Sequence, residues 1–265
     1  MEWWWLGYVA AGGVAGFFAG MLGIGGGAII VPMLVALFEA QGLPRAQIMH
    51  LAVGTALATF LFTSVASVRA HAQRGAIRWD IARRMTPGIL AGGLIGSLAS
   101  RYVSTAGFAV IFTVVIYAAA TSMLIDTKPR ASRELPGAVG MFVAGFVFSA
   151  VSALAAVGGA FLTIPFMMWC GVPLIQAIGT ASLIGLPIAL SGSVGFMIAG
   201  LGAEALPQWS LGYIYLPALA GVVAAGIVVA PLGAAVAHRT PTRWLRRTFA
   251  VLFYAVATRM LIALW

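Results

Sequence analysis

Charged residues are scarce in this sequence. Lys, Arg, Asp and Glu together make up 8% of its 265 residues, whereas 62% of the residues are hydrophobic. A soluble domain contains about 25% charged and about 45–50% apolar residues, so this scarcity excludes a soluble fold. The apolar runs are continuous and roughly twice as long as the strands of a membrane barrel, which have about ten residues each. The composition therefore predicts an all-α polytopic membrane protein.

Cysteine and acidic residues are also few. The single cysteine, Cys170, excludes a disulfide framework and a thiolate metal cluster. The six carboxylates all lie in or beside predicted loops or termini: Glu2, Glu39, Asp80, Asp126, Glu134 and Glu204. The absence of a carboxylate within a predicted span disfavours a cation or proton pump. A membrane-embedded enzyme would need an intramembrane Ser–His or carboxylate set. We therefore predict no enzyme activity, no metal and no cofactor.

The basic residues are concentrated in short polar stretches between apolar runs. The formal net charge is +9, and most of the 15 Lys and Arg lie in the ranges 69–84, 128–133 and 239–247. Cytoplasmic loops of membrane proteins carry such an excess of Lys and Arg. This rule explains the charge without a nucleic-acid partner, and it places all three stretches in the cytoplasm.

The two halves of the chain repeat one another. Four landmarks recur in the same order: "GIGGGAIIVP" (23–32) with "VGGAFLTIP" (157–165), "GLP" (42–44) with "GVP" (171–173), "AVGTAL" (52–57) with "AIGTAS" (177–182), and "YAAATSMLI" (117–125) with "YAVATRMLI" (254–262). A repeated order of motifs indicates an internal duplication. The predicted organisation is one integral membrane domain with a first repeat over 1–125, a cytoplasmic linker over 126–136 and a second repeat over 137–265.

Each repeat is predicted to contain a glycine-interrupted segment and three membrane spans. Each span has close to the ~20 residues that a helix needs to cross a bilayer. The spans are 47–69, 84–101 and 105–125, then 175–200, 211–237 and 245–264. Since the basic stretches are all cytoplasmic, segments 6–39 and 136–170 must enter and leave on the same side, as broken or re-entrant helical hairpins. A hairpin plus three spans is an odd number of crossings. The second repeat is therefore predicted to be inverted, with both termini outside the cytoplasm.

The glycine turns are the predicted binding site. A half-helix that starts inside the membrane presents unpaired N–H groups and the positive end of its dipole, and bare glycines let an anion approach those groups. Hydroxyls from the following spans are expected at similar depth, although small residues also serve helix packing. The predicted substrate-binding residues are Gly25, Gly26, Gly27, Thr55, Gly158, Gly159, Thr180 and Ser182.

Several other residues have two interpretations. Arg259 falls within the last span and either belongs to an anion pathway or snorkels to the interface. Arg45 and Arg101, on the outer side, either attract anions or simply occupy loops. His50, near a span end, is predicted to be solvated. A further set of glycines is predicted to serve only helix packing: Gly92, Gly93, Gly96, Gly145, Gly192 and Gly195.

These motifs resemble the TauE/SafE sulfite exporter family. The resemblance rests on "GFFAGMLGIGGGAIIVPML", "GLPRAQIMHLAVGTAL", "ALAAVGGAFLTIPFM" and "AIGTASLIG". One departure is that the second turn reads "VGGAF" in place of "GIGGG". The resemblance implies a secondary transporter that exports sulfite or a small organosulfonate across the bacterial inner membrane. An anion channel and a non-transporting membrane scaffold or assembly factor remain alternatives. The expected partners are the anion and the lipid bilayer, and a homo-oligomer is left open.

Overall fold

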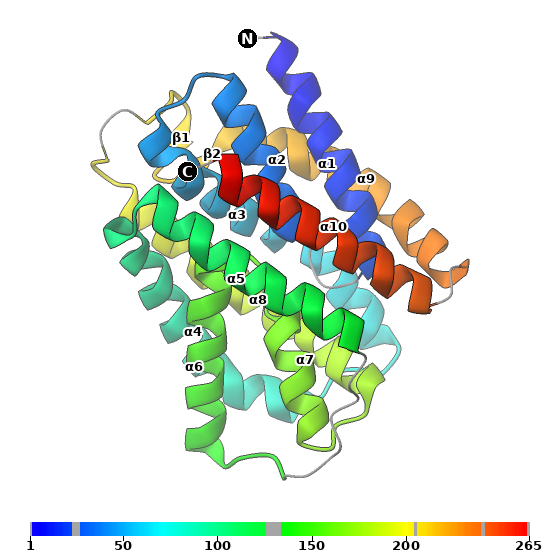
Figure 1. The fold of residues 1–265 in the computed structure, drawn as a ribbon. Coiled ribbons are helices and arrows are strands. Elements are labelled where there is room, and N and C mark those ends of the chain that lie inside the picture. Colours follow the sequence, from blue (N-terminus) through cyan, green and yellow to red (C-terminus); the bar gives the residue numbers. More distant parts are fainter. Residues whose placement is uncertain (1, 23–26, 126–133, 204–205, 240–241, 264–265) are drawn as a thin grey trace.

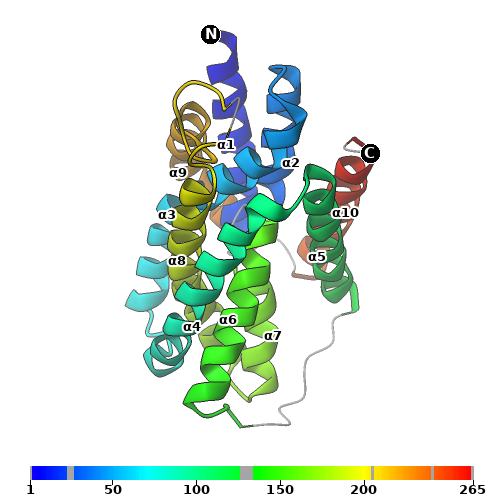
Figure 2. The same ribbon diagram turned by 90° about the vertical axis from the view of Figure 1, so that its left-hand side faces the viewer.

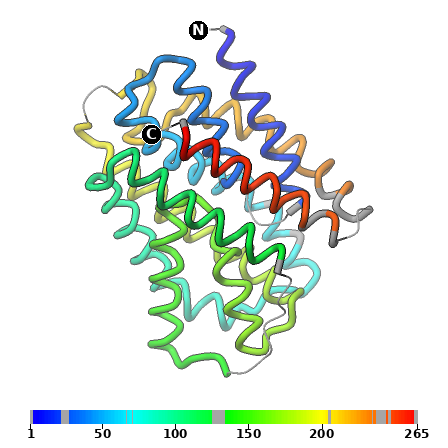
Figure 3. Tube along the Cα trace, in the orientation of Figure 1, coloured from blue at the N-terminus to red at the C-terminus, as the bar shows by residue number. Residues whose placement is uncertain are grey.

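The computed structural model describes residues 2–22, 27–125, 134–203, 206–239 and 242–263 (Figures 1 and 3). The first half of the chain forms α1 (Glu2–Leu22), α2 (Gly27–Ala40), α3 (Arg45–Gln73), α4 (Trp79–Ala99), η1 (Ser100–Tyr102) and α5 (Thr105–Ile125). The second half forms α6 (Ala138–Ala155), α7 (Ala160–Trp169), α8 (Leu174–Ala199), β1 (Ser210–Leu211), β2 (Ile214–Tyr215), α9 (Leu216–Arg239) and α10 (Thr242–Ala263). Both predicted hairpins and all six predicted spans therefore correspond to observed helices.

The prediction of a polytopic helical membrane protein is confirmed. Among the described residues, six helices are long and apolar enough to cross a membrane: α1, α3, α5, α6, α8 and α9. Helices α4 and α10, with 21 and 22 residues, have the length of a span but carry several arginines. The second helix of each hairpin is short, with 14 residues in α2 and 10 in α7, which is less than the ~20 residues of a full crossing.

The repeated "GLP" and "GVP" motifs end the two hairpins in the same way. Gly42 has φ +72° and Gly171 has φ +80°, a left-handed conformation that glycine adopts without a steric penalty. The next residue in each case donates its N–H back into the helix, Leu43 to Phe38 and Val172 to Met167. This is a glycine-based helix end. The proline that follows, Pro44 or Pro173, directly precedes the first residue of α3 or α8.

Two rows of glycines, here called glycine seams, allow α1 and α6 of the hairpins to pack closely on α9 and α4. Gly12, Gly16 and Gly20 of α1 face the backbone of α9, and Gly88, Gly92 and Gly96 of α4 face the backbone of α6. A Cβ at any of these positions would collide with the facing main chain, so glycine is required for the close approach that small residues allow between membrane helices. The six glycines assigned to packing from sequence all lie in close contact with a neighbouring helix, which agrees with that interpretation; Gly92, Gly96 and Gly145 face main-chain atoms, whereas Gly93, Gly192 and Gly195 face side chains.

The remaining helices pair antiparallel near the middle and at one side of the molecule (Figures 1 and 2). Helices α3 and α8 pack along their lengths, with Gly192 against Leu57 and Gly185 against Phe60. Helices α5 and α10 are joined by two reciprocal hydrogen bonds, which link Tyr117 to Thr258 and Tyr254 to Thr121. These four residues occupy matching positions in the repeated "YAAAT" and "YAVAT" motifs. The hairpins α1–α2 and α6–α7 lie at opposite ends of the assembly (Figure 2).

Candidate functional site

The start of α2 lies against the turn between α6 and α7. Helix α2 begins at Gly27, and a Cβ at this residue would collide with the carbonyl oxygen of Ala156, at the end of α6. Gly27 and Ala156 are both buried. The predicted site residues Gly25 and Gly26 lie outside the described residues. The start of α2 and the turn between α6 and α7 are therefore direct neighbours, although about 130 residues separate them in the sequence.

The second turn is compact. Ala156 ends α6 in a left-handed conformation with φ +48°, and Gly159 precedes the first residue of α7. Gly158 and Gly159 are buried, and a Cβ at Gly159 would collide with the Ile188 side chain of α8. In this conformation Gly27 and Gly159 are therefore covered by neighbouring atoms rather than open to a solute.

Thr55 and Thr180 each hold a loop of the opposite half of the chain. The Thr180 hydroxyl accepts the backbone N–H of Arg78 at 2.9 Å, just before α4. The Thr55 hydroxyl accepts the backbone N–H of Tyr215 at 3.0 Å, just before α9. Both threonines are completely buried. Each hydroxyl therefore fixes the chain segment that leads into a helix of the other half of the chain.

The glycine before each threonine completes the same arrangement. Gly179 packs against the carbonyl oxygen of Ala76, and Gly54 packs against that of Tyr213. In both cases a Cβ would collide with the carbonyl oxygen. In each Gly-Thr pair, the glycine thus lets the loop backbone approach closely, and the threonine hydroxyl accepts a hydrogen bond from it.

The predicted hydroxyl ligands do not converge on one point. Thr55 and Thr180 lie near opposite ends of the α3–α8 pair. Because Gly192 of α8 packs on Leu57 of α3, Thr55 lies at about the level of Gly192. A helix rises 1.5 Å per residue, so Thr180 lies about 20 Å from Thr55 along the helices. Ser182 donates to the Ile178 carbonyl oxygen at 3.0 Å and lies 3.5 Å from the Ser67 hydroxyl of α3. The structure therefore brings the start of α2 to the turn between α6 and α7 but separates these hydroxyls.

Arg259 lies at the periphery. Its side chain is exposed, and it borders a surface groove of α10 formed with Val251, Tyr254, Thr258 and Ile262, among others. The groove is largely apolar, as expected for a surface in contact with lipid, where the long arginine stem can lie along apolar atoms. This location favours the snorkelling interpretation over the pathway interpretation.

His50 is a candidate that the sequence interpretation missed. It was predicted to be solvated, but its side chain is only 5% exposed, so that prediction was wrong. Its Nε2 lies 3.0 Å from the Ser100 carbonyl oxygen, and its ring packs on Phe108 and Tyr213 with both centroid distances at 4.8 Å. The available signal was its place inside the apolar run "IMHLAV", within the predicted span 47–69.

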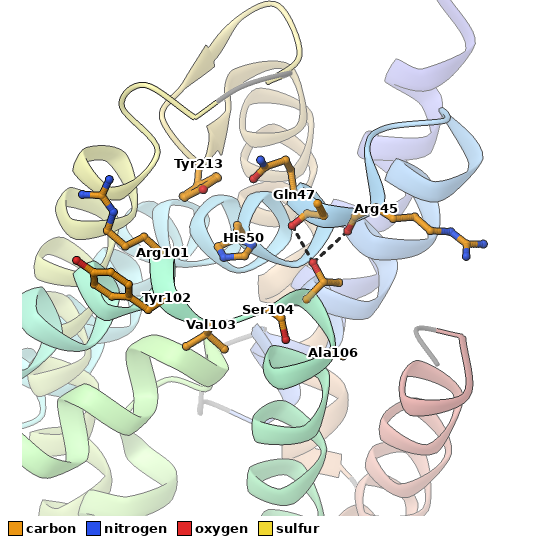
Figure 4. A pocket seen from close by; sticks show the side chains of 11 residues that line it. Arg45, Gln47, His50, Arg101, Tyr102, Val103, Ser104, Ala106 and Tyr213 are labelled. Carbon is orange, nitrogen blue, oxygen red and sulfur yellow. Dashed lines mark hydrogen bonds between the residues drawn. The ribbon is translucent and has the colours of Figure 1, made fainter.

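His50 lines a cavity of about 620 Å3 where α3 and α5 begin (Figure 4). Arg45, Arg101 and Tyr213 also border it. Burial raises the pKa of the Tyr213 phenol, while the nearby Arg101 opposes that rise. The Tyr213 hydroxyl therefore stays protonated at neutral pH and can donate a hydrogen bond.

Among the residues that the structure describes, there is no group of three or more His, Cys, Asp or Glu side chains that could hold a metal ion. The candidate groups are backbone N–H groups, hydroxyls and basic residues, and the structure places them in separate regions rather than around one point. These groups suit the recognition of an anion through hydrogen-bond donors and positive charge.

Comparisons with known proteins agree with this description. The profile of the family described as Sulfite exporter TauE/SafE matches residues 8–260. A probable membrane transporter protein of Haemophilus influenzae is 34% identical over 94% of this chain and 95% of its own. The probable membrane transporter protein YunE of Bacillus subtilis is 26% identical over 72% of this chain and 78% of its own.

A more distant relative is a probable membrane transporter protein of Methanocaldococcus jannaschii, which is 24% identical over 79% of this chain and 77% of its own. No solved structure matches the chain. The family profile covers nearly the whole sequence, including both glycine turns and both Gly-Thr pairs. The chain is a multi-pass membrane transporter that belongs to the TauE/SafE sulfite exporter family.

Proposed function

We propose that the protein is a secondary transporter that exports a small sulfur oxyanion, either sulfite or a small organosulfonate, across the bacterial inner membrane. The observation that carries this proposal is the contact between the start of α2 and the turn that follows α6, where Gly27 packs on the Ala156 carbonyl oxygen. Two interrupted helical segments that meet inside the protein are the usual location of a transporter's substrate site. Membership in a family described as sulfite exporters supports sulfite or a small organosulfonate as the proposed substrate.

The proposal includes two inverted repeats, over 1–125 and 137–265, related by a two-fold axis in the membrane plane. Three reciprocal sets of contacts support it. Thr180 holds the loop before α4 and Thr55 holds the loop before α9, the Tyr–Thr hydrogen bonds of α5 and α10 exchange partners, and α1 packs on α9 as α4 packs on α6. Reciprocal contacts between equivalent positions are the mark of two-fold symmetry.

The mechanism follows from the close packing at the turns. In the conformation described here, Ile188 covers Gly159 and the Ala156 carbonyl oxygen covers Gly27. We infer that rocking of the repeats separates these contacts and uncovers the turn amides at the starts of α2 and α7. The amides then replace part of the hydration of the anion, assisted by the positive ends of the two helix dipoles. We propose that Gly25, Gly26 and Gly158 contribute turn amides to this site, and a contact of Ser182 with the anion stays a prediction.

A two-residue experiment separates the binding role of Gly159 from its packing role. Gly159→Ala adds a methyl group that shields the turn amides and also collides with the terminal methyl of Ile188. Ile188→Val removes that methyl, after which the nearest remaining Ile188 atom is 3.7 Å from the added Cβ, an ordinary contact distance. The double variant Gly159→Ala/Ile188→Val therefore restores the packing but keeps the amides shielded.

We expect sulfite flux into proteoliposomes to fall at least tenfold in both Gly159→Ala and the double variant, and to stay near the wild-type rate in Ile188→Val. Recovery of flux in the double variant would assign Gly159 a packing role and remove the proposed site. The same assay, run with sulfite, sulfate, thiosulfate and small sulfonates, identifies the substrate class. Saturable counterflow supports a carrier over the alternative of an anion channel.

A further inference from the structure

One residue that lines the cavity at the starts of α3 and α5, His50, has a buried polar atom without a hydrogen-bond partner. His50 Nε2 faces the Ser100 carbonyl oxygen at 3.0 Å, and because a carbonyl oxygen can only accept a hydrogen bond, Nε2 carries the proton. The other ring nitrogen, Nδ1, is buried and has no hydrogen-bond partner. A buried polar atom without a partner loses its hydrogen bonds to water and gains none in the protein, which lowers stability. The geometry therefore indicates a ligand that supplies the missing contact.

The surroundings of His50 are positively polarised. Arg45 and Arg101 are exposed at the rim of the cavity, and their guanidinium groups point away from the imidazole (Figure 4). The first turns of α3 and α5 border the same space, and the Thr105 hydroxyl ties them together by donating to the Arg45 and Ala46 carbonyl oxygens at 3.0 and 2.8 Å. Two helix N-termini bring partial positive charge to one place.

The remaining lining groups suit an oxyanion. Among the described residues that line the cavity, none is acidic, and the titratable or charged ones are Arg45, His50, Arg101, Tyr102 and Tyr213. Tyr213 stacks against the imidazole with its hydroxyl available as a donor, and Ser104 adds a second hydroxyl. A volume of about 620 Å3 accommodates a small anion together with several water molecules.

We propose that this cavity is a second binding site for a small oxyanion, with His50 Nδ1 as its innermost contact and Arg45 and Arg101 as its rim. The proposal rests on the proposed function for the identity of the anion, sulfite. A neutral imidazole accepts the hydroxyl proton of hydrogen sulfite, and a protonated one donates to sulfite. Nδ1 thus gains a partner with either form of the anion.

The site is located at the end of the transport path. The cavity lies beside Tyr213, in the loop between α8 and α9, which is the extracytoplasmic end in the proposed orientation. Among the described residues that line it, none belongs to a glycine turn. An exported anion would therefore occupy it after leaving the turns, before release to the outside.

The test is calorimetric titration of sulfite into the purified full-length protein. His50→Gln retains a donor for the Ser100 carbonyl oxygen but removes Nδ1, and it should weaken sulfite binding at least tenfold. The double variant Arg45→Gln/Arg101→Gln alters only exposed side chains, so it should fold normally and weaken binding several-fold, with a smaller dependence on salt. Arg259→Gln, an exposed arginine on α10, is the matched control and should bind as wild type.

The outcomes separate this proposal from the proposed function. Wild-type sulfite affinity in both His50→Gln and the arginine double variant would overturn the cavity site, while normal sulfite flux in proteoliposomes would leave the exporter proposal standing. Conversely, binding of sulfite that depends on His50, in a protein that moves no sulfur oxyanion, would support the cavity and overturn the exporter proposal.

Discussion

At the scale of single residues, the Gly-Thr pairs show how one motif serves both halves of the chain. Thr180 and Thr55 were predicted as substrate ligands, and each hydroxyl accepts a hydrogen bond from a loop N–H. The glycine before each threonine admits the carbonyl oxygen of Ala76 or Tyr213. The motif therefore connects each repeat to a loop of the other, and its role in binding substrate stays a prediction.

Replacing Thr180 separates the structural role from the binding role. Thr180→Val keeps the shape of the side chain but leaves the Arg78 N–H without its acceptor, which should cost about 1–3 kcal/mol of stability. Thr180→Ser keeps the hydroxyl and should retain most of that stability. The measurement is thermal unfolding in detergent together with the KM for sulfite flux. An unchanged Tm with a raised KM in Thr180→Val would instead identify the hydroxyl as a substrate ligand.

At the scale of helices, the glycine seams decide which elements lie together. Helices α1 and α9 are separated by nearly 200 residues in sequence, yet Gly16 lies so close to Gly226 that an added Cβ would be 2.6 Å from its Cα. This close approach maximises van der Waals contact between the two helices. Van der Waals packing drives helix association in a bilayer, because lipid tails are as apolar as the helix surfaces and the hydrophobic effect does not favour association. The hairpins are thus held by shape rather than by polar side chains.

Two glycines of α1 provide a matched pair for testing the seam. Gly16→Ala should separate α1 from α9 and lower stability by about 1–3 kcal/mol, the typical cost of overpacking. Gly13→Ala meets only Val229, at 3.9 Å, and should be neutral or stabilising because alanine favours the helix by about 1 kcal/mol. The measurement is Tm by a thermal shift assay. Equal effects of the two substitutions would contradict a specific seam.

At the scale of the whole molecule, the loops before α4 and α9 lie at opposite ends of the α3–α8 pair. The first contacts Gly179 near the start of α8, and the second contacts Gly54 in the first part of α3. Because α3 and α8 are antiparallel, these contacts place the two loops on opposite sides of the assembly. The proposed orientation assigns the arginine-rich loop to the cytoplasm and the loop around β1 and β2 to the outside.

Cysteine labelling tests this orientation directly. In a Cys170→Ser background, which removes the single native cysteine, Gln208→Cys and Gln73→Cys place one exposed thiol in each loop region. A membrane-impermeant thiol reagent added to intact cells should label Gln208→Cys and leave Gln73→Cys unlabelled until the cells are permeabilised. The reverse pattern would invert the proposed topology and with it the outward position of the His50 cavity.

The sequence by itself determined the helices, their breaks and the membrane environment, since hydropathy, glycine turns and prolines act on neighbouring residues. It also indicated the packing role of glycines such as Gly92 and Gly195, because small residues have few other uses within a membrane span. The break between α6 and α7 lies at the predicted Gly158 and Gly159, the predicted break over 23–26 lies outside the described residues, and "GLP" and "GVP" form matching helix ends.

Only the tertiary structure decided which residues meet. The contact of Gly27 with Ala156, the loops held by Thr55 and Thr180, and the burial of His50 all depend on elements that are distant in sequence. A helix pattern specifies an apolar surface but not the partner that covers it, and in a membrane protein nearly every surface is apolar. Shape complementarity and the pairing of buried polar groups select the partner, and both require three-dimensional contacts.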